Sequence, residues 1–391
     1  MEEKKTKVCP RNSILDYNLS WGLIVVYLGY LLGIWFAQQS TKDYIPGGFT
    51  GAPYFLVAIL IGLVFTFLFY NAGKIIFAHI AGYRVSYVKL LGFLINKSGD
   101  KAKVKFDILS IFDLSLQFTP KDDDVKKNPK LIFLGGFIAE FIIVAASLVI
   151  FFVLGLNQVK TTRAAVGWTS LFTMLYGFLT PLYEILPFRQ DCPTDIFNVL
   201  VTSKPEDKIA YNVVCINRKN EHAGKELMPY QFESYDSFYR ARVLYVNYLD
   251  DLYASRLEKA FNTLEQMHYY SKYLNDTDRY IPNAETVYLR YLVDDVSGAD
   301  QAYLATKKDD KKSVTNPETL SDYRTAVLVA GFITCDAEKI KEITEKFDKL
   351  LATYEQPYSK RVLKEQELFN AALAKIEKSK PELISKDNKA E

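Results

Sequence analysis

Cysteine is sparse in this sequence of 391 residues, and its four cysteines lie far apart, at positions 9, 192, 215 and 335. No CxxC pair occurs. This spacing argues against a zinc ribbon and against a disulfide scaffold. We therefore expect four reduced thiols that face a reducing cytoplasm.

An excess of one charge is also lacking, because 48 Lys and Arg residues balance 46 Asp and Glu residues. The resulting net charge of +2 excludes a polycation suited to nucleic acid, so we expect no nucleic-acid partner. The distribution is uneven, however. Residues 44–73 contain no charged side chain, whereas residues 205–391 are rich in charge throughout. This contrast predicts a membrane half followed by a soluble half.

Four apolar stretches have about the length that a helix needs to cross the hydrocarbon core of a bilayer. They cover residues 19–38, 53–82, 131–156 and 164–186. Lys and Arg gather in the N-terminal tail (1–18) and in the loop 83–130, which the positive-inside rule places in the cytoplasm. We therefore predict a multi-pass protein of the plasma membrane, in contact with the lipid bilayer, with both termini cytoplasmic.

The predicted membrane domain, residues 19–200, contains one segment with strand character. Residues 103–118 alternate polar and apolar side chains, which predicts one or two short strands in the cytoplasmic loop. The expected fold class is thus an all-α membrane protein with a short β segment, joined to a second, helical domain.

The second domain is predicted over residues 204–378, followed by a charged tail, 379–391. Its amphipathic pattern predicts helices at 234–252, 255–274, 317–332, 337–354 and 356–377. Breaks are expected at 275–276, 297–298, 316–317 and 356–357. This succession of short amphipathic helices is similar to a tetratricopeptide-like (TPR-like) array of α-hairpins, although no clean sequence repeat is present. Its many tyrosines either line a peptide-binding groove or, as we expect, fill the seams between helices.

Three motifs follow one another in the membrane half. The second apolar stretch contains Tyr70-Asn71-Ala72-Gly73-Lys74 and then Gly82-Tyr83-Arg84-Val85. The third opens with Leu134-Gly135-Gly136-Phe137-Ile138-Ala139-Glu140. The fourth ends with Tyr183-Glu184-Ile185-Leu186-Pro187-Phe188, shortly before Thr194-Asp195-Ile196. In order and spacing these segments resemble site-2-protease-type (M50) intramembrane zinc metalloproteases, whose HExxH motif would fall on residues 70–74.

The resemblance implies a lost active site. In that family two histidines one helical turn apart and an aspartate bind zinc, and a glutamate acts as the general base. Here Tyr70 and Lys74 replace the histidines, Asn71 replaces the base, and Asp195 remains at the position of the third ligand. An amide cannot accept a proton at neutral pH, and an ammonium cannot coordinate a metal without losing its charge. We therefore expect a degenerate member with neither metal nor other cofactor.

The three histidines do not supply a substitute. His79 lies five residues after Lys74 and points to a different side of the helix, as expected of an interfacial residue. His222 and His268 lie in the soluble half without a second ligand nearby in the sequence. A zinc site built from these residues is not expected.

The charged residues of the membrane half must still find partners, because charge inside a membrane span is costly. We predict that Lys74 occupies the place of the lost metal and pairs with Asp195. Glu140 or Glu184 is expected close by, so that the four residues form a polar intramembrane cluster. Alternatively, Lys74 extends to the cytoplasmic headgroups.

The resemblance favours a pseudoprotease that binds or regulates a membrane or secreted peptide without hydrolysis. Its helical domain would dock a cytoplasmic or membrane protein. By analogy with bacterial members, a bacteriocin or signalling-peptide system is expected. One alternative is an active membrane peptidase with a non-standard site or a nucleophile such as Cys192. Another is a subunit of a peptide export system.

Overall fold

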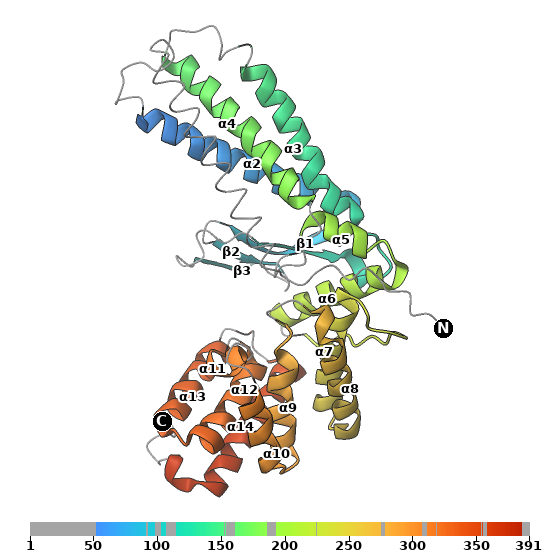
Figure 1. Ribbon diagram of the computed structural model, residues 1–391, viewed down its shortest axis with the longest axis vertical. Coiled ribbons are helices and arrows are strands. Elements are labelled where there is room, and N and C mark those ends of the chain that lie inside the picture. Colours follow the sequence, from blue (N-terminus) through green and yellow to red (C-terminus); the bar gives the residue numbers. More distant parts are fainter. Residues whose placement is uncertain are drawn as a thin grey trace. The chain divides into compact units, whose positions relative to one another are not determined.

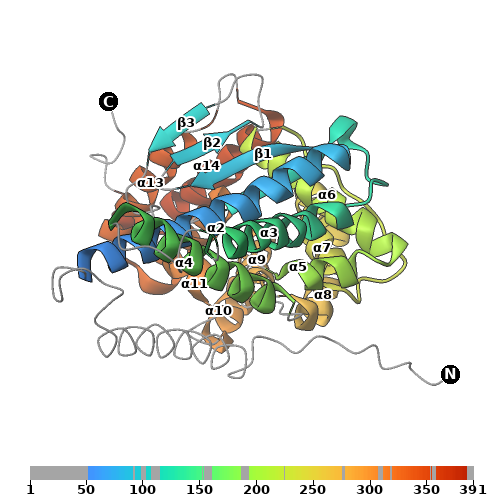
Figure 2. The same ribbon diagram turned by 90° about the horizontal axis from the view of Figure 1, so that it is seen from above.

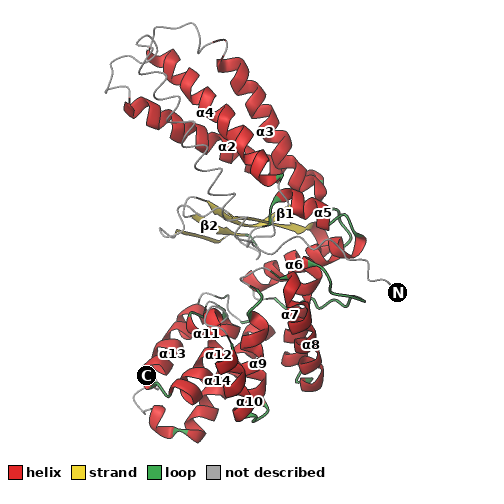
Figure 3. Cartoon of the chain, in the orientation of Figure 1, coloured by secondary structure: helices red, strands yellow, loops and turns green. Residues whose placement is uncertain are grey.

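The computed structural model describes residues 52–90, 93–97, 103–106, 115–151, 153, 161–185, 193–223, 225–274, 278–306, 311–317, 319–352, 354 and 358–384. The described chain is mostly helical, with one small sheet (Figure 3). It divides into two compact units, residues 1–85 with 120–208, and residues 86–119 with 209–391. The predicted tail (1–18) and the first predicted span (19–38) lie outside the described residues.

Three long helices form the body of the first unit, and each packs on the other two (Figures 1 and 2). They are α2 (Ala52–Ile80), α3 (Lys130–Ile150) and α4 (Thr161–Glu184). A short helix, α5 (Asp195–Val201), packs on α3. The second, third and fourth predicted spans therefore correspond to α2, α3 and α4.

Two of the described helices are long and apolar enough to cross a membrane, over Leu60–Ile80 and Lys130–Ile150. Helix α4 is not one of them, although it occupies the fourth predicted span. Its hydroxyl side chains include Thr169, Thr173 and Thr180, and Pro181 lies within it. These polar residues lower its hydrophobicity below that of α2 and α3.

Gly82 ends α2 and starts the sheet. Its backbone has φ = +78°, and its N–H donates to the carbonyl of His79 at 3.1 Å. A glycine in this left-handed conformation is a common way to end a helix, because a side chain there would be strained. The chain then leaves the helix axis and enters β1.

The sheet has four strands in the order β3-β2-β1-β4. They are β1 (Tyr83–Leu90), β2 (Phe93–Asn96), β3 (Lys103–Phe106) and β4 (Ser115–Pro120). The pairs β1–β2 and β2–β3 are antiparallel, with Leu90 opposite Phe93 at the hairpin. The predicted β segment 103–118 is present as β3 and β4. The first two strands were not predicted, because the end of α2 and the following segment were interpreted as one motif.

The second unit contains a succession of helices, most of which pack on a neighbour in the sequence. They are α6 (Pro205–His222, which begins in the first unit), α7 (Phe238–Tyr253), α8 (Leu257–Tyr270), α9 (Ile281–Leu292), α10 (Val296–Ala305), α11 (Lys312–Thr315), α12 (Leu320–Val329), α13 (Ala337–Leu351) and α14 (Lys360–Ser379). Every helix predicted in this half corresponds to one of these.

One predicted break is wrong. Ser297 and Gly298 lie inside α10, and the chain turns a few residues earlier, where Asp294 has φ = +63°. The side chain of Asp295 caps α10 by accepting from the N–H of Gly298 at 2.9 Å. A glycine near a helix start is therefore compatible with the helix here, because the preceding aspartate supplies the cap.

Aromatic side chains fill the core of the second unit. Tyr248, Tyr288 and Tyr291 are almost fully buried, and Phe347 stacks on Phe369 with ring centroids 3.8 Å apart. These tyrosines fill seams between helices, which was the expected alternative to a groove. Burial of each such ring removes a large apolar area from water and stabilises the array.

Candidate functional site

A polar cluster in the first unit contains the residues that the sequence singled out. Tyr70 and Lys74 are four residues apart on α2 and therefore lie on one face of the helix. The hydroxyl of Tyr70 donates to Oδ2 of Asp195, at the start of α5. The same oxygen lies 2.8 Å from Nζ of Lys74. The predicted pairing of Lys74 with Asp195 is thus present in the structure.

The ammonium of Lys74 does not extend away to solvent. Its side chain is 17% exposed, that of Asp195 is 4% exposed, and Nζ lies 4.5 Å from the centroid of the Tyr70 ring. A cation over an aromatic face gains electrostatic energy, and more so where water is excluded. One compact, mostly buried cluster is therefore formed by the Tyr70 ring, the Lys74 ammonium and the Asp195 carboxylate.

Glycines set the distance between α2 and α3 at this point. A Cβ atom on Gly136 would lie 2.5 Å from the ring of Tyr70, and one on Gly73 would lie 2.4 Å from the carbonyl oxygen of Gly135. The two helices can approach this closely only because these positions lack side chains. The Gly-Gly pair of the third stretch thereby fixes Tyr70 against α3, where it also meets Phe137 edge-on at 6.3 Å.

Glu184 joins the cluster through the backbone. Its Oε2 accepts the N–H of Asp195 at 2.7 Å, which ties the end of α4 to the start of α5. This carboxylate fixes the position of Asp195 from a second side. The aspartate is therefore held by three groups: a phenol, an ammonium and, through its own N–H, a carboxylate.

Glu140 on α3 is different, because neither of its carboxylate oxygens has a hydrogen-bond partner among the described residues. The side chain is fully buried. Thr180 is a neighbour, but its hydroxyl donates to the carbonyl of Tyr176 at 3.1 Å. A buried carboxyl group without a partner carries a substantial desolvation cost.

Asn71 occupies the position at which the resemblance places the general base. Its side-chain amide donates to the carbonyl of Phe67, one turn back in α2, at 2.8 Å. This is a local bond within the helix. The cluster therefore contains a phenol, an ammonium and carboxylates, while the amide of Asn71 is bonded within its own helix.

The described residues contain no group of three or more His, Cys, Asp or Glu side chains arranged to hold a metal ion. His79 is exposed near the end of α2, and His268 is exposed and bonds to the Thr286 hydroxyl at 2.8 Å. His222 is the last residue of α6 and is distant in sequence from His79 and His268. Cys192 lies outside the described residues.

A second polar cluster, in the core of the second unit, was not predicted. Arg324 on α12 is fully buried between Glu285 on α9 and Glu365 on α14, with N–O distances of 2.9 and 3.0 Å. Tyr248 donates to Glu285 at 2.9 Å, and Tyr253 donates to Glu365. Burial raises the pKa of Glu285, and the Arg324 guanidinium offsets part of this rise. The cluster crosslinks the helices of the array.

A signal for this second cluster is present in the sequence. Glu285 lies on the same helix face as Tyr288 and Leu289, three and four residues on, and both are buried. A charged residue on the apolar face of an amphipathic helix requires a partner of opposite charge. The arginine that provides it is 39 residues away in sequence, so its identity depends on the tertiary fold.

Comparison of the chain with protein family models, with curated proteins and with solved structures gives no match.

Proposed function

We propose that this chain is a membrane-embedded pseudoprotease of the site-2-protease-like type. In this proposal it binds or regulates a membrane or secreted peptide at the first unit and a protein partner at the helical second unit, without zinc-dependent hydrolysis. The observation that carries the proposal is the convergence of Tyr70 and Lys74 on the same oxygen of Asp195.

The exposed apolar surface of α2 and α3 supports membrane insertion. Leu60, Ile76, Phe141, Ile142 and Val149 are each more than half exposed. A soluble protein rarely exposes large apolar side chains over such a length of two helices, whereas lipid is a suitable solvent for them. In the proposal α4 and residues 19–38 complete a four-span domain, with both termini cytoplasmic.

The convergence of Tyr70 and Lys74 on Asp195 supports the resemblance to site-2-protease-type proteases. If residues 70–74 replace the metal-binding motif, positions 70, 74 and 195 must be able to surround a single point. Asp195 lies 125 residues from Tyr70 in the sequence, yet Tyr70 and Lys74 both contact one of its carboxylate oxygens. The ammonium then takes the place of the metal as the positive charge beside the aspartate.

The same geometry argues against hydrolysis at this site. A zinc hydrolase needs an open coordination position for water and a base to accept its proton. Here the phenol and the ammonium already occupy the aspartate oxygen, and the amide of Asn71 is bonded to Phe67. Binding and regulation require neither a metal nor a base, and they are the activities that remain.

Restoration of the motif tests the proposed ancestry. The wild-type protein, purified in mild detergent without chelator, is expected to contain less than a tenth of an equivalent of zinc. The triple variant Tyr70→His/Asn71→Glu/Lys74→His is expected to bind about one equivalent of zinc, as three protein ligands suffice for such a site. The added change Asp195→Ala should abolish that binding. One equivalent in the wild type, or none in a folded triple variant, would refute the proposal.

Photocrosslinking in intact membranes tests peptide binding. A photoreactive phenylalanine at Asn71, beside the cluster, is expected to capture a polypeptide. The matched control at Phe141, which is 77% exposed on α3, is expected to capture lipid only. Equal capture at both positions would count against a peptide site.

A further inference from the structure

A cavity of about 240 Å³ lies within the second unit, among α6, α7, α8 and α9. Most of its wall is apolar, formed by side chains such as Val214, Leu227, Leu249, Met267, Leu274 and Ile281. This volume is below the usual range for drug-sized ligands and suits one amino-acid side chain with its adjoining main chain. Neither polar cluster described above accounts for it.

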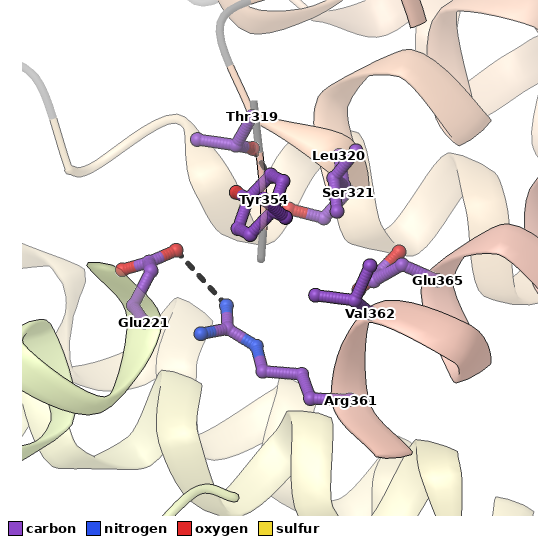
Figure 4. Close-up of a pocket in the computed structure, with 8 residues that line it drawn as sticks. All are labelled: Glu221, Thr319, Leu320, Ser321, Tyr354, Arg361, Val362 and Glu365. Carbon is purple, nitrogen blue, oxygen red and sulfur yellow. Dashed lines mark hydrogen bonds and ion pairs between the residues drawn. The ribbon is translucent and has the colours of Figure 1, made fainter. Parts of the chain in front are cut away.

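Among the described residues, the polar part of the wall carries three arginines and two carboxylates. Arg242 pairs with Asp278 at 2.6 Å, and Arg361 pairs with Glu221 at 2.9 Å. Figure 4 shows the second pair at a smaller adjoining pocket, where the Arg361 guanidinium points to Glu221. The third arginine, Arg218, makes no ion pair among the described residues. Among the described residues that line the cavity, one arginine is therefore left without a carboxylate partner.

The positive charge of Arg218 acts on another arginine of the wall, Arg242. Burial lowers the pKa of Arg242, Asp278 raises it, and the nearby positive charge of Arg218 lowers it again. Arg218 and Arg242 both line the cavity, and their positive charges repel each other. A ligand that brings one more negative charge would relieve this repulsion, and a guanidinium binds a carboxylate with well-defined geometry.

We infer that this cavity binds the C-terminus of a peptide, with the terminal carboxylate on Arg218 and an apolar last side chain inside the cavity. One surplus positive charge matches one carboxylate, and not a polyphosphate or a nucleic acid. The inference does not depend on the membrane site.

Fluorescence anisotropy with the full-length protein in detergent tests this site. The probe is the labelled five-residue peptide GSGSL with a free carboxylate, and its reference is the same peptide with a C-terminal amide. The free acid is expected to bind at least about tenfold more tightly, because a charge-assisted hydrogen bond carries that much affinity. Arg218→Gln should remove this preference and leave amide binding unchanged.

The matched control is Arg256→Gln, a second partly exposed arginine that does not line the cavity. It should leave the preference for the acid intact. Because Arg218 is exposed, its variant should retain the near-ultraviolet circular dichroism of the wild type. A second variant, Met267→Trp, fills the cavity and should weaken both peptides.

Several results would overturn the inference. They are equal binding of acid and amide, an undiminished preference in Arg218→Gln, and no binding of either peptide at millimolar concentration. Tight binding of dodecanoate that excludes the peptide would assign the cavity to a fatty acid instead.

Discussion

Replacement of Arg324 by methionine gives the sharpest test of the energetics of the second unit. The substitution removes a fully buried cation and leaves Glu285 and Glu365 unpaired in the core. Removal of one partner from a buried ion pair costs about 3–5 kcal/mol, because the other charge stays buried without compensation. Domains are stable by only about 5–15 kcal/mol. We therefore expect this unit of Arg324→Met to unfold roughly 10 °C below the wild type.

The pH dependence of this loss has a defined sign. Burial raises the pKa of Glu285 in the folded state above its ordinary value of 4.5. Such a carboxyl contributes stability below the unfolded-state pKa, and the contribution is lost as the pH rises through the folded-state pKa. Arg324 opposes the rise, so its removal raises the pKa of Glu285 further. The deficit of Arg324→Met should therefore be smaller at pH 5 than at pH 8, by about 1 kcal/mol or more.

The chain supplies a spectroscopic means to assign the unfolding event. Its three tryptophans, at positions 21, 35 and 168, all fall within the sequence ranges of the first unit. The tyrosine signal in near-ultraviolet circular dichroism reports mainly on the second unit, where most described tyrosines are found. The tyrosine transition should move in Arg324→Met while the tryptophan fluorescence transition stays in place.

Two further variants complete this experiment. The triple variant Arg324→Met/Glu285→Gln/Glu365→Gln, which removes all three charges, should recover at least half of the lost stability. Arg256→Met removes an exposed arginine paired with Asp250 and Asp251 and should leave the melting temperature unchanged. An unchanged melting temperature in Arg324→Met, or a deficit that grows in acid, would refute the reasoning.

Two other predictions concern the first unit, and both are read by tryptophan fluorescence during thermal unfolding in detergent. Lys74→Met should lower its stability by about 3 kcal/mol, because Asp195 stays buried without its cation, and Lys74→Met/Asp195→Leu should recover most of the loss. Additive effects of the two changes would show that the pair is not coupled. Glu140→Gln should raise the stability by about 1 kcal/mol, because it removes the free-energy cost of keeping a buried carboxyl without a partner neutral. A lower melting temperature would indicate a partner for Glu140 that this reasoning lacks.

The parts of the fold that depend on local pattern were predicted from the sequence. The apolar length of residues 53–82 and 131–156 located α2 and α3, and amphipathic periodicity located the helices of the second unit. The pairing of Lys74 with Asp195 was predicted because the resemblance places both positions beside one metal ion and because buried charge requires a partner.

Features that depend on contacts between distant segments were not predicted. Strands β1 and β2 are short, and their hairpin pairing shows only in three dimensions. Arg324 reaches Glu285 and Glu365 across 39 and 41 residues, and the cavity beside Arg218 needs several helices to enclose it. A sequence pattern identifies a buried face but not the helix that covers it.

The polar residues of the first unit have to be considered together, because a single cation, Lys74, lies among several carboxylates in the described part of this unit. A metal site with two neutral histidines and one aspartate would carry a net charge of +1 around a dication. In this chain the cation beside Asp195 is the Lys74 ammonium, and Glu140 and Glu184 lie in the same helical bundle. Lys74 cannot balance three carboxylates at once. Asp195 is bonded to Tyr70 and Lys74, and Glu184 accepts from a backbone N–H, so Glu140 is the group left to be neutral. This is why loss of Lys74 should destabilise the unit, whereas the neutral substitute Glu140→Gln should not.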